Sequence, residues 1–134
     1  MSGEALARAA EALVGAPFRL HGRDPRTGLD CLGVVACALE AIGRPAPVPP
    51  GYRLRSRMPA DLAARAAGCG FVAAGGDVIP GDVLLVRPSP CQLHFVVAAA
   101  RGRFIHAHAG LRRVIACEQL PAGALAGHWR LAPN

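Results

Sequence analysis

Apolar residues recur at helical spacing in the first part of the chain. From residue 3 to residue 14 they form one face, made of Leu6, Ala9, Ala10, Leu13 and Val14. This spacing predicts an amphipathic helix that ends at Gly15 and Pro17. The segment from Ala16 to Leu29 is polar and rich in Gly and Pro, which indicates a long structured loop of the kind that often carries function.

A second, almost wholly apolar helix is predicted from about Cys31 to Ile42. One of its faces consists of Leu32, Val35, Leu39 and Ile42. Asp30 stands at the N-cap and Gly43 near the C-terminal end, the positions where these residue types are preferred. Because nearly all of its side chains are apolar, we expect this helix to be central and buried.

The helical pattern breaks in the next segment. Residues 44–52 hold several prolines and cannot continue a helix. Pro59 suits the first turn of a short third helix that ends near Gly68 or Gly70. We interpret this segment as an insertion or lid and not as a second domain.

Short apolar runs separated by turn residues follow Pro80-Gly81-Asp82. They predict antiparallel strands at Val83 to Arg87, Leu93 to Ala99, Arg103 to His108, Arg112 to Ala116 and His128 to Leu131. Helices first and strands afterwards indicate one α+β domain over residues 1–134, with a sheet packed on the second helix.

The formal charge of +6 comes from fifteen arginines and no lysine, set against nine acidic residues. The arginines are spread along the chain and only six aromatic residues could stack on bases, so we expect no nucleic-acid partner. An anionic polymer stays open as a partner. No apolar run approaches the roughly eighteen residues of a membrane span, and the N-terminus lacks a secretory signal. We therefore expect a protein made in the cytoplasm that does not span a membrane.

Five cysteines form an odd set without a C-x-x-C pair, which argues against a disulfide framework and against a zinc site. Cys31 differs from the rest because it follows Asp30 and opens the buried helix, where free backbone N–H groups and the helix dipole favour a thiolate. The alternative is that Cys31 is a buried small hydrophobe, as most free cysteines are. We interpret the other four as packing residues: Cys37, Cys69, Cys91 and Cys117.

His94 and His106 lie in two predicted strands, twelve residues apart, with a turn around Arg101-Gly102 between them. A histidine beside a thiol can take its proton, and a second polar group fixes the tautomer, so Cys31, His94 and His106 form a chemically complete nucleophilic triad. His108 competes with His106, since alternation in a strand puts both on one face. We expect three histidines to be half-buried with satisfied hydrogen bonds: His21, His108 and His128.

Several segments resemble the NlpC-type cell-wall cysteine peptidases, which are papain-like. Gly15-Ala-Pro-Phe18 and Asp30-Cys31-Leu32-Gly33 resemble the family's catalytic segment, and Pro80-Gly81-Asp82-Val83 resembles its turn into the first strand. His94-Phe95-Val96-Val97 and Phe104-Ile105-His106-Ala107 look like the family's two histidine strands. The resemblance extends over essentially the whole chain.

This resemblance implies that Cys31 is the nucleophile, His94 the general base and His106, in preference to His108, the group that orients the base. It also makes candidate substrate-binding residues of Phe18, His21 and Asp30. Three residues depart from the family pattern: Phe18 replaces Tyr, His21 replaces Gly and Leu32 replaces Ser. The Asp-Cys-Leu-Gly sequence is associated with phage and gene-transfer-agent members. No metal or organic cofactor is implied.

The implied reaction is hydrolysis of an amide in the peptidoglycan stem peptide, between D-γ-glutamate and a diamino acid. Phage-like tail proteins are the implied partners, and the chain would be incorporated into a phage-like particle. The residues themselves point only to thiol-dependent acyl transfer. Two alternatives stay open: a tail-assembly or structural protein that kept the fold and lost activity, and an amidase or acyltransferase of the same fold, with the loop from Arg44 to Pro59 shaping its cleft.

Overall fold

The computed structural model describes residues 2–44, 66–89 and 92–132. Two helices, α1 (Ser2–Glu11) and α2 (Cys31–Ala41), stand on either side of a short hairpin, β1 (Arg23–Asp24) and β2 (Gly28–Leu29). Six strands follow: β3 (Phe71–Ala73), β4 (Val83–Ser89), β5 (Gln92–Ala98), β6 (Phe104–His108), β7 (Arg113–Cys117) and β8 (Ala124–Leu131). None of the helices in the described part of the chain is long and apolar enough to span a bilayer.

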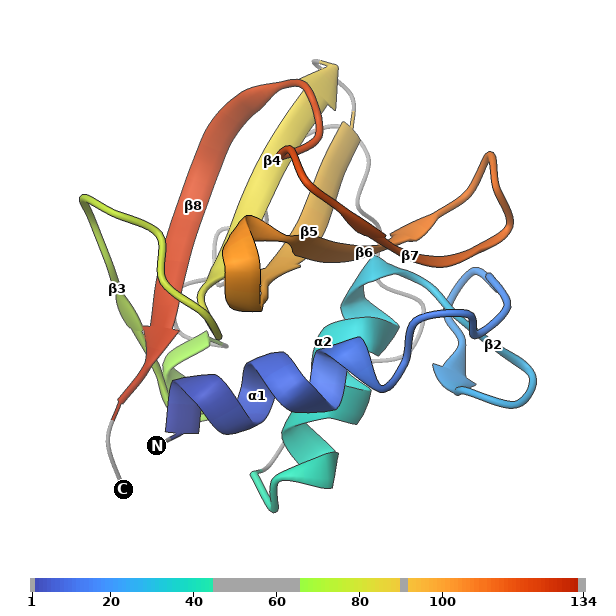
Figure 1. Cartoon of the computed structure of the whole chain (residues 1–134), viewed down its shortest axis with the longest axis horizontal. Coiled ribbons are helices and arrows are strands. Elements are labelled where there is room, and N and C mark those ends of the chain that lie inside the picture. The colour runs from blue at the N-terminus through green and yellow to red at the C-terminus, as the bar shows by residue number, and fades with distance from the viewer. Residues whose placement is uncertain (1, 45–65, 90–91, 133–134) are drawn as a thin grey trace.

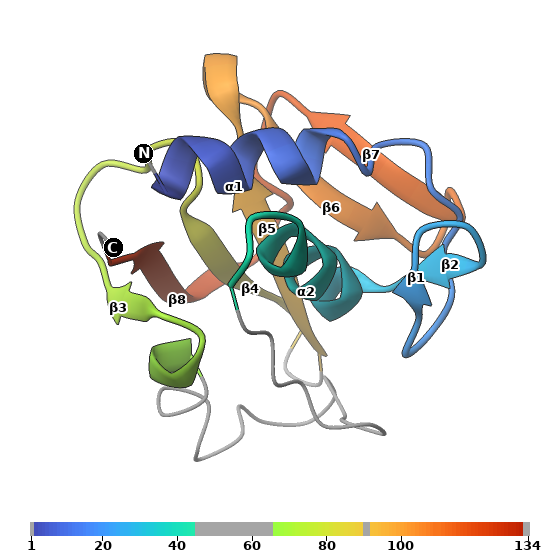
Figure 2. The same cartoon turned by 90° about the horizontal axis from the view of Figure 1, so that it is seen from below.

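The six later strands form one antiparallel sheet in the order β3-β8-β4-β5-β6-β7. The sheet is strongly curved, so that β8 and β4 run steeply in Figure 1 while β6 and β7 run across them. Helices α1 and α2 pack against each other and cover the same side of this sheet (Figures 1 and 2). The α+β class, with the sheet packed on the second helix, is confirmed.

Most of the core lies between the two helices and the sheet. Its fully buried side chains include Leu6, Val34, Leu39, Leu85, Val97 and Ile105, each at most 1% exposed. Because neighbouring side chains along a strand point to opposite faces, the intervening residues Leu84, Val86 and Val96 form a smaller cluster of their own. The sheet is therefore apolar on both faces near its centre, which holds β4 and β5 rigidly in place.

Helix α1 is shorter than the sequence predicted. Its apolar positions Leu6 and Ala10 are buried, but the helix ends at Glu11, and Val14 is 44% exposed. The Gly15 N–H donates to the carbonyl of Val114, 2.9 Å away. The N–H groups of Leu13 and Val14 bond three residues back, so the chain continues as turns after Glu11 as far as Gly15, whose φ is 96°; the contact with Val114 then joins it to β7.

Helix α2 agrees with its prediction within one residue at each end. The expected N-cap is confirmed, since the Asp30 side chain accepts a hydrogen bond from the Gly33 N–H at 2.8 Å. At the C-terminal end Gly43 adopts a positive φ of 78°. The N-terminus of α2 is thus fixed by its own sequence.

Five of the described strands differ from the prediction by more than one residue: β1 and β2 form a hairpin in the segment expected to be a loop, and β4 runs on to Ser89; the other two are β8 and β3. β8 begins at Ala124, four residues before the expected start at His128, because pairing with β4 extends it through Leu125 and Ala124. β3 was not expected at all; it forms because Phe71 to Ala73 pair with the end of β8. Residues 45–65, with the start of the expected third helix, lie outside the described residues; residues 66–68 are helical and Gly70 has a φ of 92°.

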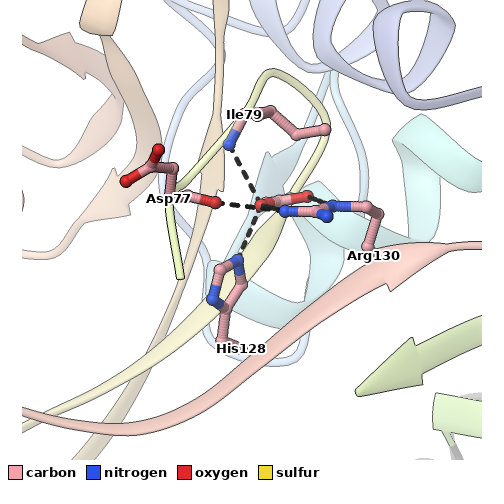
Figure 3. A network of polar contacts seen from close by, with 5 residues as sticks. Asp77, Ile79, His128 and Arg130 are labelled. Carbon is pink, nitrogen blue, oxygen red and sulfur yellow. Dashed lines mark hydrogen bonds and ion pairs between the residues drawn. The ribbon is translucent and has the colours of Figure 1, made fainter. Parts of the chain in front are cut away.

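Asp82 anchors the turn before β4 to the last strand through His128 and Arg130. Figure 3 shows these two side chains and Ile79 turned toward one another. The fully buried carboxylate of Asp82 lies 2.6 Å from Nε2 of His128 and accepts hydrogen bonds from the Arg130 guanidinium at 2.8 and 2.9 Å and from the Ile79 N–H at 3.1 Å. Burial raises the pKa of Asp82, but the hydrogen bonds from Arg130 and His128 outweigh it and hold that pKa below its ordinary value. His128 is therefore a satisfied structural residue, as predicted.

Candidate active site

Cys31 is the first residue of α2, and its side chain is almost covered. The residue is 5% exposed and packs in the main core, with its sulfur close to the backbone of Phe95 in β5. The sulfur also lies near the backbone N–H groups of Leu32 and of Cys31 itself, at the open end of the helix. The thiol is thus placed between the start of a helix and the middle of a strand.

Asp30 ties the preceding loop to the start of α2. Its buried carboxylate accepts hydrogen bonds from the Gly33 N–H and the His21 N–H, each at 2.8 Å, and forms an ion pair with Arg23 at 3.5 Å. A side chain at Gly33 would overlap the carbonyl oxygen of Gly22, so the loop reaches the helix only because that position is glycine. The Asp30 carboxylate is thus engaged by groups of the protein at the start of α2, and its expected part in substrate binding stays a prediction.

The two candidate histidines meet across β5 and β6. Nε2 of His94 lies 2.7 Å from Nδ1 of His106, and their rings are nearly perpendicular, with centroids 4.8 Å apart. The expected turn connects these strands through Ala100 to Gly102, and Arg101 takes a positive φ of 63°. The sequence spacing of the two histidines therefore corresponds to a direct hydrogen bond.

His108 does not take the place of His106. Its ring lies 5.9 Å from the His106 ring, and its Nδ1 accepts the Leu111 N–H at 3.0 Å. It is half-buried with a satisfied ring nitrogen, as expected. His106 is only 5% exposed, and alone of the two it is hydrogen-bonded to His94.

Cys31 contacts β5 at Phe95, the residue that follows His94 in the sequence. The described ladder between β5 and β6 consists of Val97 with Ile105 and Ala98 with Phe104. Within the described residues, no hydrogen bond joins the Cys31 thiol to His94. Since Nε2 of His94 is occupied by His106, only Nδ1 is left to accept a proton from a thiol.

Burial controls the protonation of this site. It raises the pKa of Cys31 to about 12; the backbone of Phe95 lowers this pKa by less than burial raises it, and the charge of Asp30 raises it a little further. Burial also lowers the pKa of His94 to about 4, with the charges of His106 and His108 adding to the shift, and it lowers the pKa of His106. Desolvation thus outweighs the free N–H groups at the helix start, and the pKa of the buried thiol lies above its ordinary value.

The two remaining candidate substrate-binding residues lie on the loop before α2. Phe18 is half-buried, packs against the main core and donates its N–H to the carbonyl of Arg112 at 2.9 Å. His21 has a positive φ of 61° and an exposed side chain. The expectation that His21 is half-buried is wrong, because its left-handed backbone turns the residue outward as the chain doubles back toward Asp30.

Cys117 was interpreted as a packing residue, and this was wrong. Its sulfur lies 3.3 Å from Nε2 of His106, so it contacts the second histidine on the side away from His94. The other described cysteines are placed differently: Cys37 donates to the carbonyl of Arg23 at 2.9 Å, and Cys69 packs against the core. Cys91 lies outside the described residues. Only the register of β6 with β7 could have indicated the Cys117 contact, and the sequence does not fix that register.

Among the residues that the structure describes, no group of three His, Cys, Asp or Glu side chains is arranged to hold a metal ion. The candidate site thus consists of a buried thiol at a helix N-terminus, a histidine pair on two neighbouring strands and a second thiol beyond them. Such a set can support acyl transfer through a thioester without further groups.

No protein-family model matches the chain, and no curated protein matches it. Solved structures do. NlpC1 from Trichomonas vaginalis superposes with a TM-score of 0.70 and 19% identity over 96% of this chain and 44% of that one. The NlpC/p60 domain of the peptidoglycan hydrolase SagA superposes with a TM-score of 0.61 and 22% identity over 95% of this chain and 98% of that domain. The fold is that of the NlpC/P60 domains.

An NlpC/P60 family protein from Bacillus cereus ATCC 10987 has the same arrangement, with a TM-score of 0.70 and 18% identity over 99% of this chain and 41% of that chain. This chain therefore spans less than half the length of the Trichomonas and Bacillus proteins, and nearly all of the SagA domain. The papain-like α+β architecture expected from the resemblance is confirmed by these structures.

Proposed function

We propose that this chain is a thiol-dependent hydrolase of cell-wall peptides, in which Cys31 is the nucleophile, His94 the general base and His106 the group that orients His94. One observation carries the proposal: in an NlpC/P60 fold, a thiol at a helix N-terminus lies against the backbone of Phe95 in β5, and the residue before it, His94, is hydrogen-bonded through Nε2 to a second histidine.

The reaction begins from a neutral thiol and a neutral imidazole. As a substrate carbonyl approaches, Nδ1 of His94 takes the Cys31 proton, and the thiolate and imidazolium then stabilise each other. The sulfur attacks the carbonyl carbon, while backbone N–H groups at the start of α2 hold the oxyanion. His94 gives its proton to the leaving amine, and a water activated by His94 hydrolyses the thioester.

The bond we propose is the amide between D-γ-glutamate and a diamino acid of the peptidoglycan stem peptide. Two observations support a wall substrate: the Asp30-Cys31-Leu32-Gly33 sequence and the likeness to a domain of a peptidoglycan hydrolase. We further propose cytoplasmic synthesis and incorporation into a phage-like particle among tail proteins. Mass spectrometry of purified phage-like particles tests the proposed incorporation. Particles that do not contain this chain would contradict it.

A second candidate function is a structural protein that keeps the fold without catalysis. The observation in its favour is that Cys31 is only 5% exposed and, within the described residues, makes no hydrogen bond to His94. This candidate predicts that Cys31→Ala changes neither products nor assembly.

The test compares the wild type with two variants on purified peptidoglycan fragments, with products identified by mass spectrometry. Cys31→Ala removes the nucleophile, and Cys69→Ala is the matched control because Cys69 is a half-buried cysteine packed against the same core. Cleavage by the wild type and by Cys69→Ala alone supports the proposal and names the bond. Absence of cleavage, with turnover of other acyl substrates by the same proteins, favours an amidase or acyltransferase; no turnover of either favours the structural role.

A further inference from the structure

Cys117 extends the histidine pair by one more hydrogen bond. Cys117 in β7 pairs with Phe104 in β6, and His106 in β6 pairs with Ile115 in β7. Diagonal neighbours of this kind share one face of an antiparallel sheet and are within reach of each other. The Cys117 sulfur consequently lies 3.3 Å from Nε2 of His106, whose Nδ1 lies 2.7 Å from Nε2 of His94.

Cys117, His106 and His94 form a row of hydrogen-bonded side chains. A neutral imidazole carries only one N–H hydrogen, so the direction of one hydrogen bond in this row fixes the direction of the next. For His94 to accept a proton on Nδ1, its hydrogen has to be on Nε2, and that N–H then donates to Nδ1 of His106. The hydrogen of His106 is consequently on Nε2, where Cys117 has to accept it. If the Cys117 S–H donated instead, every hydrogen in the row would be reversed, and Nδ1 of His94 would already be protonated.

We propose that Cys117 is a positioning residue whose sulfur accepts the Nε2–H of His106 and thereby holds His94 in the tautomer that can deprotonate Cys31. The inference rests on the proposed function for its catalytic meaning, but the tautomer itself is a property of the resting protein. A thiol is a weak donor and a weak acceptor, so its contact with Nε2 of His106 allows the direction that a proton-accepting Nδ1 of His94 requires.

The experiment measures the tautomers of His94 and His106 by long-range ¹H–¹⁵N NMR of the whole chain at neutral pH, without substrate. We expect both rings to carry hydrogen on Nε2 in the wild type. Cys117→Ala removes the acceptor, and we expect a population of His94 with hydrogen on Nδ1 to appear. Cys117→Ser restores an acceptor and should restore the wild-type tautomer, while Cys69→Ala, which alters a cysteine away from the histidines, should change nothing.

A second measurement separates positioning from packing. We expect kcat of Cys117→Ala on the cleaved wall peptide to fall about tenfold with KM within about twofold, because orientation of the base is lost while substrate contacts remain. Cys117→Ser should recover most of the loss. Wild-type tautomers in Cys117→Ala, or hydrogen on Nδ1 of His94 in the wild type, would overturn the inference. If the protein cleaves no peptide, the proposed function is refuted. The NMR measurement needs no activity, so it would still decide whether Cys117 fixes the tautomer of His94.

Discussion

Nε2 of His94 and Nδ1 of His106 are 2.7 Å apart, and this contact determines how the pair can act. It occupies Nε2 of His94 with His106, so only Nδ1 of His94 is left to accept a proton from Cys31. A buried pair of this kind is held by the strands on which it stands, because β5 and β6 are joined through the tight turn at Ala100 to Gly102. The orientation of His94 is thus built into the sheet.

Replacement of His106 should affect turnover far more than replacement of His108. We expect His106→Ala to lower kcat on the order of a hundredfold, because His94 loses the group that fixes its tautomer and ring orientation. His108→Ala is the control, since His108 stands on the same strand face without bonding His94. Steady-state kinetics on the cleaved peptide measures both, with thermal unfolding to confirm folding. A larger loss of kcat in His108→Ala than in His106→Ala would mean that His108, and not His106, orients His94.

The depressed pKa of His94 makes folding sensitive to mild acid. Between the ordinary value of 6.5 and the folded value of about 4, the unfolded chain binds a proton that the folded chain does not. Stability should therefore fall as pH drops through this window, by about 3 kcal/mol from this residue. Urea unfolding from pH 7 to pH 4 measures the slope, which His94→Gln should flatten. His21→Gln replaces an exposed histidine and is the control; an equal slope in wild type and His94→Gln would contradict the prediction.

The Cys31 thiol should stay protonated up to strongly alkaline pH in the resting protein. Its pKa is raised from 9.0 to about 12 by burial, so the free energy that favours the folded thiol is present below pH 9 and is lost as pH rises toward 12. Thiolate absorbance near 240 nm, taken as the difference between the wild type and Cys31→Ser, measures this titration. A difference signal already present near pH 6 would instead indicate a resting ion pair with His94.

Loss of the Asp82 carboxylate should destabilise the fold. In Asp82→Asn an amide replaces the group that accepts from Arg130 and His128, which leaves donors facing each other in a buried place. We expect the free energy of unfolding to fall by about 2 kcal/mol. Asp77→Asn is the matched control, because Arg130 contacts only the backbone carbonyl of Asp77. Equal unfolding midpoints for the two variants in urea would show that the network contributes nothing.

Gly33→Ala should displace the loop that leads into Cys31. The added methyl group would meet the carbonyl oxygen of Gly22, and both are backbone positions that cannot turn aside. We expect a loss of stability of about 2 kcal/mol together with reduced turnover. Gly68→Ala, where a side chain meets open space, should leave both unchanged. Thermal unfolding and peptide cleavage of the two variants test this; wild-type behaviour of Gly33→Ala would mean that the loop adapts.

Local sequence accounts well for the helices and the central strands. Asp30 caps α2 because a short acidic side chain reaches the N–H of Gly33, a contact within one turn. The strands from Val83 onward follow from apolar runs between turn residues. The existence of β3 did not follow, because the end of β8 supplies its hydrogen bonds from far along the chain.

The amino-acid sequence by itself determined that Cys31 opens a buried helix and that His94 and His106 stand on successive strands, since capping, periodicity and turn residues act over a few neighbours. Only the tertiary structure decided which histidine meets His94, that Cys117 meets His106, and that burial raises the pKa of the Cys31 thiol. The first two depend on strand register and the third on how much water the packed core excludes. Strand register and the exclusion of water are properties of the whole fold, so no short segment of the sequence determines them.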